Sequence, residues 1–573
     1  MEIRELADEI IETDVLVIGG GLAGCMAALQ AKEHGVRVSV LEKAAIRRSG
    51  ECGRGIDHYP IPHPYFTGIR AEEYGQMRAS EFAGMVSKSL SIITAEESLK
   101  PLIVLEDIGV KIREEDGSVK IQPGRISLSS KSKDIGKGDF LLYRGADVKI
   151  KLAAALKERG VDIFDRTMLT ALLVKDGSVK GATAVNVRNA KFIVFKAKTF
   201  VLSTGGIQRL YAYPSAPFPN HLFIGYTTPT NAGGGTAAAY RAGARLSNLE
   251  FVYIHTTTAG LPWGQLVNMG ATVVNSKGED LWEKYPHARE KYPLGGLYPT
   301  TNVAFMPNTS EAVIGRDVIY FDTSQITREK EWGGNIIYGN ECPTFLGLML
   351  ARGGIKKEPV ELKPWLTGLP RNLCGVLHDE RGESSLKGLF VAGDVGGGLA
   401  LYGATAAFAW GYRVGHFAAE DALQTQEYAF DKTLAKQVYD ERQRVIGPLG
   451  LENGLNPLEL EEVVRNLMRQ NVGINKIEPR LKRTLEQLHV IKEEFIPCLS
   501  ASNAHELMRV IEVKDIIDIA EIHTNASLIR TESRMAPAHF RIDYPEQDDS
   551  NWRKSIIIER AGGKMNYSLE END

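Results

Sequence analysis

The chain has 573 residues, enough for about two to four domains, and its 68 Lys and Arg against 72 Asp and Glu give a formal net charge of −4. The basic residues are dispersed among acidic ones, which excludes the basic face or arm that nucleic-acid binding requires. The acidic N-terminus has no charged segment followed by an apolar one, and no apolar run reaches the ~18 residues that span a bilayer, so we expect a cytoplasmic protein without membrane insertion.

Five cysteines are scattered along the chain without any CxxC pair. Iron–sulfur clusters and structural zinc sites need several thiolates at short spacing. We therefore expect no metal site in this chain, and we interpret the cysteines as buried or surface thiols in a reducing compartment. They are Cys25, Cys52, Cys342, Cys374 and Cys498.

Residues 14–18 form a short β-branched apolar run, typical of a buried parallel strand, and residues 25–34 have helical composition. Between them lies a GxGxxG loop made by Gly19, Gly21 and Gly24. Glycines in such a loop permit a tight turn, close approach of the backbone to a pyrophosphate, and close packing of helix on strand. The next strand, 36–41, ends at Glu42, whose carboxylate can bind ribose hydroxyls. This order predicts a dinucleotide site.

Helices and strands continue to alternate, with a helix predicted at 149–160 and a strand at 161–165, as in a parallel sheet with crossover helices. FVLSTGG at 200–206 and GLFVAGDVGGG at 388–398 are further buried strands that end in glycine turns. Each can return the chain to the cofactor. Asp394 can accept hydrogen bonds from a polyol there, or it can cap a helix N-terminus. The three strand ends together imply one extended cofactor.

The remaining segments change in character along the sequence. Residues 249–364 are rich in Gly, Pro, Tyr and Thr with poor periodicity, and an apolar helix is predicted at 404–419. From about 426 onward, apolar residues recur at three and four with charges between, which is typical of a helical bundle and not of membrane helices. These helices include 432–446, 458–471 and 479–495. The final stretch mixes Arg, His and Asp, and we expect it to fold back on the other parts.

Blocks spread over nearly the whole chain resemble the flavoproteins of the fumarate reductase, succinate dehydrogenase and adenylylsulfate reductase superfamily. They are the loop at 19–24, EKAAIRRSG at 42–50, STGG at 203–206, TNAGGGTAAAYRAGARLSNLEFV at 230–252, GLFVAGD at 388–394 and RTESRMAPAHFRIDYPEQDDSNW at 530–552. The resemblance implies an α/β fold that binds FAD. It has a Rossmann-like FAD-binding domain in two pieces (1–248 and 365–425), an inserted α+β capping domain (249–364), a helical domain (426–530) and a C-terminal segment packed back on the others (531–573).

The strand ends and the matching blocks together give the candidate cofactor-binding residues. They are Gly19, Gly21, Leu22, Ala23, Gly24, Glu42, Lys43, Ser49, Gly50, Gly55, Thr204, Gly205, Gly206, Gly393, Asp394 and Ala404. In the respiratory enzymes of this superfamily an Arg-Ser pair precedes a histidine that links covalently to the flavin. Here Gly50 follows the pair, so the resemblance implies non-covalent FAD.

Two features are similar to the α subunit of adenylylsulfate reductase, namely RSG at 48–50 and GRDVIYFDT at 315–323. Fumarate reductases bind substrate with an Arg-Gly-Glu-Gly-Gly run, a histidine and a further arginine, where this chain has 267–271 (VNMGA), Pro370 and Ala406. A preorganised cation is typically worth about a hundredfold in rate, so ordinary fumarate or succinate chemistry is not expected. Adenylylsulfate reductase also has a histidine near Pro370, so this enzyme's substrate can differ from both.

The resemblance places the substrate where the capping domain closes over the flavin ring. Arg371 is the best cation near the missing histidine. Other candidates also have structural interpretations, namely a hydrogen-bonded histidine for His255, a core side chain for Trp263, a salt bridge with Asp317 for Arg316 and a buried thiol for Cys374. The candidates are Arg54, His58 and Tyr59 in GRGIDHYP, then His255, Trp263 and Arg316 in the cap, and Arg371, Cys374 and Tyr402 in the second piece.

The leading interpretation is an FAD-bearing catalytic subunit of the adenylylsulfate reductase type, which exchanges two electrons with a small anionic substrate at flavin N5. Since the chain has no cluster ligands, electrons that arrive singly require a separate iron–sulfur subunit. Two alternatives stay open. One is a reductase or dehydrogenase of enoates or acyl thioesters, and the other is a flavin electron-relay subunit without its own substrate.

Overall fold

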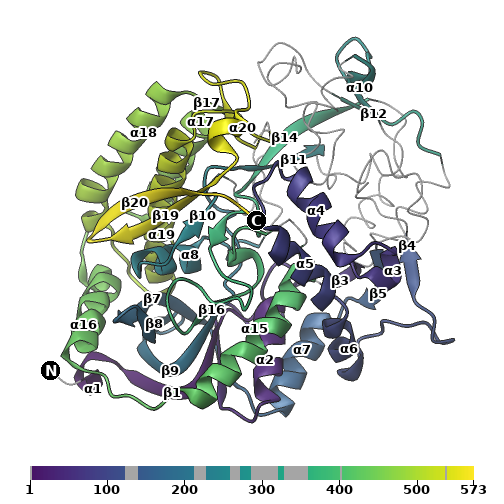
Figure 1. Ribbon diagram of the computed structural model, residues 1–573. Coiled ribbons are helices and arrows are strands. Elements are labelled where there is room, and N and C mark those ends of the chain that lie inside the picture. Colours follow the sequence, from purple (N-terminus) through teal and green to yellow (C-terminus); the bar gives the residue numbers. More distant parts are fainter. Residues whose placement is uncertain are drawn as a thin grey trace.

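The computed structural model describes residues 3–53, 55–122, 140–211, 228–258, 272–284, 320–327, 359–399, 403–535 and 538–573. A seven-stranded sheet forms the centre of the fold (Figure 1). Its path runs β6 (Asp162–Asp165), β2 (Val38–Glu42), β1 (Glu9–Ile18), β9 (Phe192–Leu202), β8 (Ser178–Asn186) and β7 (Thr167–Lys175), and β16 (Leu389–Val391) also pairs with β9. The pairs β6–β2, β2–β1, β1–β9 and β9–β16 are parallel, whereas β7–β8–β9 is antiparallel.

The register of the sheet brings the strand ends together. Ile18 at the end of β1 lies opposite Leu41 of β2 and Leu202 of β9, and Leu202 lies opposite Val391 of β16. These residues are almost fully buried because both faces of the parallel part are covered, which explains the continuous apolar runs of the sequence. Four carboxyl ends therefore meet at one edge, and the predicted α/β fold class is confirmed.

Two helices pack closely against each other on this sheet. They are α2 (Leu22–Lys32), which follows β1, and α15 (Ala404–Gln424), which follows β16. A Cβ atom on Gly411 would clash with the carbonyl oxygen of Ala23, and one on Gly415 with that of Ala27, so two glycines of α15 allow the close contact. The helix predicted at 149–160 is α7 (Val148–Glu158), which packs on α2.

The remaining N-terminal structure consists of short helices and a small sheet of order β3-β5-β4. Their bounds are α1 Ile3–Leu6, β3 Ile56–Pro60, α3 Pro64–Thr67, α4 Ala71–Glu81, α5 Lys88–Glu97, α6 Lys100–Asp107, β4 Lys120–Gln122, β5 Phe140–Gly145 and α8 Gly234–Arg241.

Two further four-stranded sheets join distant parts of the sequence. The first, in the order given, contains β15 (Gly375–Val376), β10 (Leu246–Ser247), β19 (Ser555–Ala561) and β20 (Lys564–Glu570). The second contains β11 (Tyr253–Thr258), β14 (Val360–Gly368), β13 (Tyr320–Asp322) and β12 (Thr272–Val274), beside α10 (Leu281–Lys284). In Figure 1 the second sheet extends away from the N-terminus of the chain.

The C-terminal helices lie along one side of the central sheet (Figure 1, left). They are α16 (Lys432–Ile446), α17 (Pro457–Asn471), α18 (Glu478–Val490) and α19 (Ala504–Ile529), followed by α20 (Asp549–Trp552), and β17 (Asn475–Lys476) pairs with β18 (Phe540–Arg541). The helices predicted at 432–446 and 458–471 are confirmed. The helix predicted at 479–495 ends as an α-helix at Val490 and continues as a π turn, Ile491–Phe495, before Pro497, which has no N–H to extend it.

Within the described ranges, no helix combines the length and the apolar character that crossing a bilayer requires.

Candidate functional site

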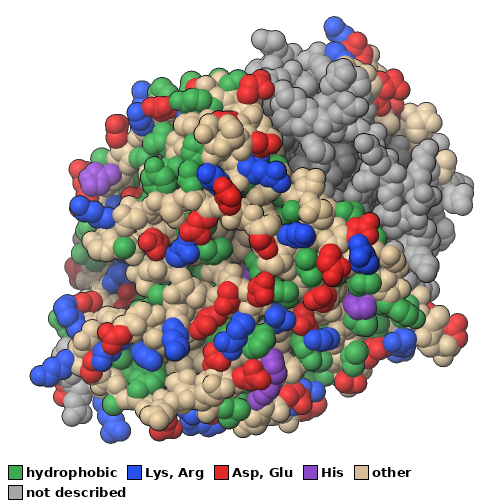
Figure 2. All heavy atoms as spheres, in the orientation of Figure 1, with side chains coloured by type: hydrophobic (Ala, Val, Ile, Leu, Met, Phe, Trp, Pro, Cys, Tyr) green, Lys and Arg blue, Asp and Glu red, His purple; other side chains and the backbone are tan. Residues whose placement is uncertain are grey.

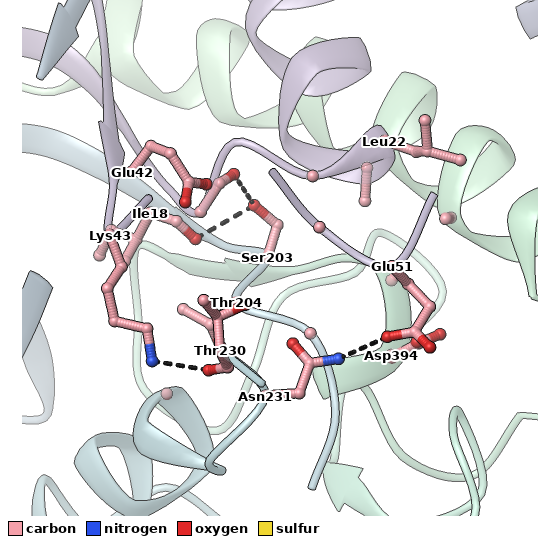
Figure 3. A pocket seen from close by; sticks show the side chains of 18 of the residues that line it. Ile18, Leu22, Glu42, Lys43, Glu51, Ser203, Thr204, Thr230, Asn231 and Asp394 are labelled. Carbon is pink, nitrogen blue, oxygen red and sulfur yellow. Dashed lines mark hydrogen bonds between the residues drawn. The ribbon is translucent and has the colours of Figure 1, made fainter. Parts of the chain in front are cut away.

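A cavity that opens to solvent lies at the carboxyl edge of the central sheet (Figure 3). The ends of β1, β2, β9 and β16 all contribute to its wall. In open α/β sheets, ligands bind at this edge. Figure 3 shows Glu42 and Lys43 on one side of the cavity and Glu51 and Asp394 on the other.

The glycine loop after β1 has the geometry of an anion cradle. Gly19 has a φ of 106°, which favours glycine, and a Cβ there would clash with the carbonyl oxygen of Ser203. A Cβ on Gly24 would clash with the carbonyl oxygen of Gly19, so this glycine allows the helix to pack against the loop. No side chain caps the start of α2 at Gly21. The first N–H groups of the helix are therefore open to a phosphate.

Glu42 at the end of β2 is fixed by two backbone groups. Its Oε2 accepts a hydrogen bond from Gly20 N at 2.8 Å, and its Oε1 accepts one from Ala44 N at 2.6 Å. Each carboxylate oxygen has a second lone pair, and the side chain lines the cavity. Glu42 can therefore accept hydrogen bonds from ribose hydroxyls while it holds the loop.

The segment that follows β9 contributes two hydroxyl groups near the cavity, those of Ser203 and Thr204. Ser203 Oγ donates to the carbonyl oxygens of Gly19 at 2.8 Å and Ile18 at 3.1 Å, which ties the end of β9 to the end of β1 (Figure 3). Next to it, Thr204 Oγ1 is buried at the cavity wall and has no hydrogen-bond partner among the described residues. Such a group is satisfied by a ligand or by water.

On the opposite wall, Arg371 is held by carboxylates. Its Nη2 donates to Glu51 Oε1 at 2.8 Å, and its Nε lies 3.8 Å from Asp394 Oδ2, too far for a hydrogen bond. Glu51 Oε2 in turn accepts from Asn231 Nδ2 at 3.0 Å (Figure 3). Arg371 Nε is buried and has no hydrogen-bond partner within the described part of the chain.

In the cluster of Arg371, Glu51 and Asp394, burial and the neighbouring opposite charges have opposing effects on the pKa values. Burial raises the pKa of Asp394 to about 6, against the effect of Arg371 and with a contribution from Glu51. Burial also disfavours the charge on Arg371, but Glu51 and Asp394 outweigh it and the pKa of the guanidinium is raised, so it stays charged. The positive guanidinium of Arg371 therefore lies beside two acidic side chains, those of Glu51 and Asp394.

Most of the predicted cofactor residues meet at the cavity. The lining contains Gly19, Gly21, Leu22, Ala23, Glu42, Lys43, Gly50, Thr204, Gly205, Gly393, Asp394 and Ala404, together with Arg371. Gly24, Ser49, Gly55 and Gly206 are not part of it. Ser49 Oγ donates instead to the carbonyl oxygen of Gly20 at 3.1 Å.

The remaining catalytic candidates fall into two groups. Tyr59 is buried and its hydroxyl donates to Ser98 O at 2.9 Å, and Cys374 donates to Asn248 O at 2.6 Å; burial raises the pKa of both. Neither lines the cavity. His58 lies on β3 and His255 on β11, but their side chains lie outside the described structure, as do the residues Arg54, Trp263, Arg316 and Tyr402 and the thiol Cys342.

Several lining residues were not among the candidates. Glu51 is the most important, since it joins Arg371 to Asn231. The sequence holds a weak signal for it, because Glu51 directly follows Gly50. Asn231 and the glycines after it stand in the TNAGGG block of the resemblance. The apolar wall formed by Ile18, Leu41, Met168 and Leu169 gave no separate signal.

The residues at the cavity fit FAD. The uncapped start of α2 suits a pyrophosphate, and Glu42 and Asp394 offer acceptors for hydroxyl groups at well-separated positions. The apolar wall suits aromatic rings. Thr204 Oγ1 and Arg371 Nε are buried polar atoms that have no hydrogen-bond partner among the described residues and could bind polar groups of the cofactor or substrate.

Two family descriptions match the sequence. Residues 14–330 match the family described as the FAD binding domain, and residues 461–572 match the one described as the fumarate reductase flavoprotein C-term. The first match covers more than half of the chain.

Individual relatives align over nearly the full length. One subunit of the fumarate reductase (CoM/CoB) of Methanothermobacter marburgensis is 27% identical, with 97% of this chain and 98% of the relative covered. L-aspartate oxidase of Vibrio cholerae is 25% identical over 94% of this chain and 97% of its own length. The structure of adenylylsulfate reductase from Archaeoglobus fulgidus superposes with a TM-score of 0.84, at 22% identity, and covers 100% of this chain and 97% of the other. That likeness shows a shared fold.

Proposed function

The chain belongs to the FAD binding domain family and is an FAD-dependent oxidoreductase, and from this premise we propose that it is the catalytic flavin subunit of a two-electron reductase that acts on a small anionic substrate. The observation that supports this proposal is the buried Nε of Arg371, a charged donor at the cavity wall without a hydrogen-bond partner among the described residues. An oxyanion is the ligand that satisfies such a donor best.

Different residues at the cavity bind different parts of the cofactor in this proposal. Bound FAD supplies the transfer of two electrons at N5. The glycine loop and the start of α2 bind the pyrophosphate, and Glu42 accepts from ribose hydroxyls. Asp394 faces the cavity from the end of β16 and accepts from a polyol. Gly50 stands where a covalent histidine would be, so the binding is non-covalent.

Arg371 orients the substrate in this proposal. Its Nη2 is bound by Glu51, which fixes the plane of the guanidinium, and its Nε stays available. A fixed cation stabilises negative charge that develops on the substrate without having to move. This role keeps the adenylylsulfate reductase type of reaction as the leading candidate, because a sulfur oxyanion is compact and charged.

The relative named as a fumarate reductase favours a second candidate substrate class. It aligns over 97% of this chain, and reduction of a carbon–carbon double bond next to a carboxylate also places an oxyanion near a cation. The missing substrate-binding groups at 267–271, Pro370 and Ala406 count against it.

A separate iron–sulfur protein is part of the proposal. The five cysteines are too dispersed to hold a cluster, so electrons that arrive singly must reach the flavin from another chain. The relative from Methanothermobacter marburgensis is named as one subunit of its enzyme, which supports an assembly of several chains. Full activity of the purified single chain with a soluble two-electron donor would contradict this part.

The test is an anaerobic titration of the oxidised holoprotein with sulfite, followed by AMP, while the flavin absorbance is recorded. Net flavin reduction on addition of AMP supports the adenylylsulfate reaction. If AMP has no effect but fumarate or another enoate reoxidises the reduced flavin, the second candidate is correct.

Arg371→Met is the matching variant, and we expect it to weaken binding of the effective anion by about tenfold or more. Arg188→Met, on the exposed β8–β9 turn, is its control. Equal anion affinity in Arg371→Met and the wild-type protein would refute the role of Arg371. No response to any of these anions would refute the proposed substrate class.

A further inference from the structure

A buried lysine lies directly behind the glycine loop. Lys149 is the second residue of α7, and its side chain is 0% exposed. Its ammonium donates a hydrogen bond to the carbonyl oxygen of Gly20 and contacts Cys25 Sγ at 3.3 Å. Lys149 does not line the cavity, so its contacts with the loop and the first turn of α2 lie on the far side from a ligand.

These contacts complete a clamp on one residue of the loop, Gly20, through the two peptide groups on either side of its Cα. Gly20 N donates to Glu42, while Gly20 O accepts from Lys149, from Ser49 Oγ at 3.1 Å and from Cys25 Sγ at 3.3 Å. Three donors draw this carbonyl oxygen to the protein side. A carbonyl turned toward the cavity would repel a phosphate, so the clamp keeps the loop in its anion-binding form.

The charge of Lys149 matters as much as its hydrogen bonds. Two carboxylates, Glu42 and Asp165, interact electrostatically with the neighbouring thiol of Cys25 and therefore lie close by. Burial raises the pKa of this thiol, against the effect of Lys149, so Cys25 is neutral. Lys149 thus places a positive charge near Cys25, where Glu42 and Asp165 also act, close to the helix start that would receive a pyrophosphate.

We propose that Lys149 is a positioning residue of the cofactor site, which fixes the Gly20 carbonyl away from the cavity and supplies buried positive charge behind the pyrophosphate. It sets the affinity for the phosphate part of FAD and leaves the affinity for the isoalloxazine part unchanged. This inference rests on FAD being held at the glycine loop.

The experiment compares Lys149→Met with the wild-type protein, both as full-length chain freed of flavin. Three ligands are titrated, namely FAD, ADP and riboflavin, with flavin fluorescence for the first and third and calorimetry for ADP. Lys157→Met, an exposed lysine on the same helix, is the matched control. We expect Lys149→Met to bind FAD and ADP about ten- to a hundredfold more weakly. Riboflavin, which has no phosphate, should bind equally well to all three proteins.

Two outcomes would overturn the inference. One is unchanged affinity of Lys149→Met for FAD and ADP, and the other is an equal loss for all three ligands, which indicates only a damaged fold. If Lys149→Met does not fold, Lys149→Gln carries the same prediction, because it keeps a donor for Gly20 and loses the charge. Failure of the wild-type chain itself to bind FAD would instead refute the cofactor site.

Discussion

Asp394 and Glu51 both lie close to Arg371, and the raised pKa of Asp394 makes stability depend on pH. In the unfolded chain an aspartate titrates near ~3.9, whereas burial raises the pKa of Asp394 to about 6 in the folded protein. The native state therefore binds the extra proton between these values. This contribution to stability is complete below about pH 4 and is lost as pH rises through 6.

Asp394→Asn removes this titration, so its stability relative to the wild-type protein should increase with pH. We expect the difference in free energy of unfolding, measured by urea denaturation of flavin-free protein, to shift by about 1–3 kcal/mol in favour of the variant between pH 4 and pH 8. The same difference at both pH values would show that Asp394 has an ordinary pKa.

Glu51→Gln should release the charge of Arg371. The ion pair between Glu51 Oε1 and Arg371 Nη2 is 2.8 Å long, and glutamine keeps a hydrogen bond there without the negative charge. We expect the variant to bind sulfite several-fold more tightly than the wild-type protein, as measured by loss of the oxidised flavin absorbance. Glu33→Gln, which changes an exposed pair with Arg159, is the control. Weaker binding in Glu51→Gln would mean that the carboxylate itself supports the anion.

Individual site residues can be predicted only where the local sequence requires a particular backbone conformation at that position. The sequence predicts Gly19 and Glu42, which line the cavity, because a strand, a tight turn and an acid follow one another at fixed spacing. It does not predict Glu51, since its partner Arg371 is 320 positions away and only the fold brings them together. The resemblance predicts Ser49 at the cofactor, whereas the structure shows its hydroxyl bound to the loop carbonyl of Gly20.

The contact between α2 and α15 links helix packing to the cofactor site. A Cβ at Gly411 would clash with the backbone of Ala23, in the first turn of α2. We expect Gly411→Ala to lower the free energy of unfolding by about 1–3 kcal/mol and to release FAD more readily, because the start of α2 must move. Urea denaturation and flavin retention on gel filtration measure the two effects.

Gly447→Ala is the control for this variant. Gly447 follows α16, has helical backbone angles and has no atom within 4 Å of an added Cβ. It should leave flavin retention unchanged and should not lower the free energy of unfolding, which can rise by about 0.4–1 kcal/mol. A wild-type stability for Gly411→Ala would show that the two helices separate without cost.

The amphipathic helix α16 and the apolar helix α15 are predictable from the sequence, whereas α19 shows neither pattern clearly. The bounds of α16 match the predicted helix at 432–446, since its apolar residues recur at three and four on one face. In contrast, α19 has buried residues on nearly all sides, among them Val510, Ile511 and Val513, so its sequence lacks a polar stripe that would mark a surface helix. The two-residue strands β10 and β15 are too short for any periodicity.

A buried ionic network connects the cavity to the helical part of the fold. Arg209 pairs with Glu461 of α17 and with Glu512 of α19, both at 2.6 Å, and all three side chains are at most 3% exposed. Glu512 also pairs at 2.8 Å with Lys43, which lines the cavity. Arg209→Met leaves two buried carboxylates without this partner, and we expect a loss of about 3–5 kcal/mol in the free energy of unfolding.

The control for this network is an exposed pair. Lys436→Met removes the partner of Asp440 on α16, where the two side chains are 74% and 56% exposed, and it should change stability by less than about 0.5 kcal/mol. Equal effects of the two variants in urea denaturation would show that Arg209 contributes no more than a surface charge.

The surface agrees with the charge balance of the sequence. On the face in Figure 2, acidic and basic side chains of the described residues are interspersed. The α/β class was predictable because glycine turns follow buried strands in a characteristic order. The exact domain boundaries stay a prediction, and the pairing of β19 with β10 had no signal in either segment.

That pairing has a consequence for how the protein is made. A ribosome completes β1, α2 and β9 early, but β16, whose end closes the cavity wall, emerges only after residues 203–388, and β19 reaches β10 later still. During synthesis β10 is thus an unpaired strand edge of the nascent chain, and the cavity lacks the part of its wall that the end of β16 provides. We therefore expect FAD to bind only after β16 has been translated, and until β19 pairs with β10 the nascent chain carries an unpaired strand edge of the kind that favours aggregation.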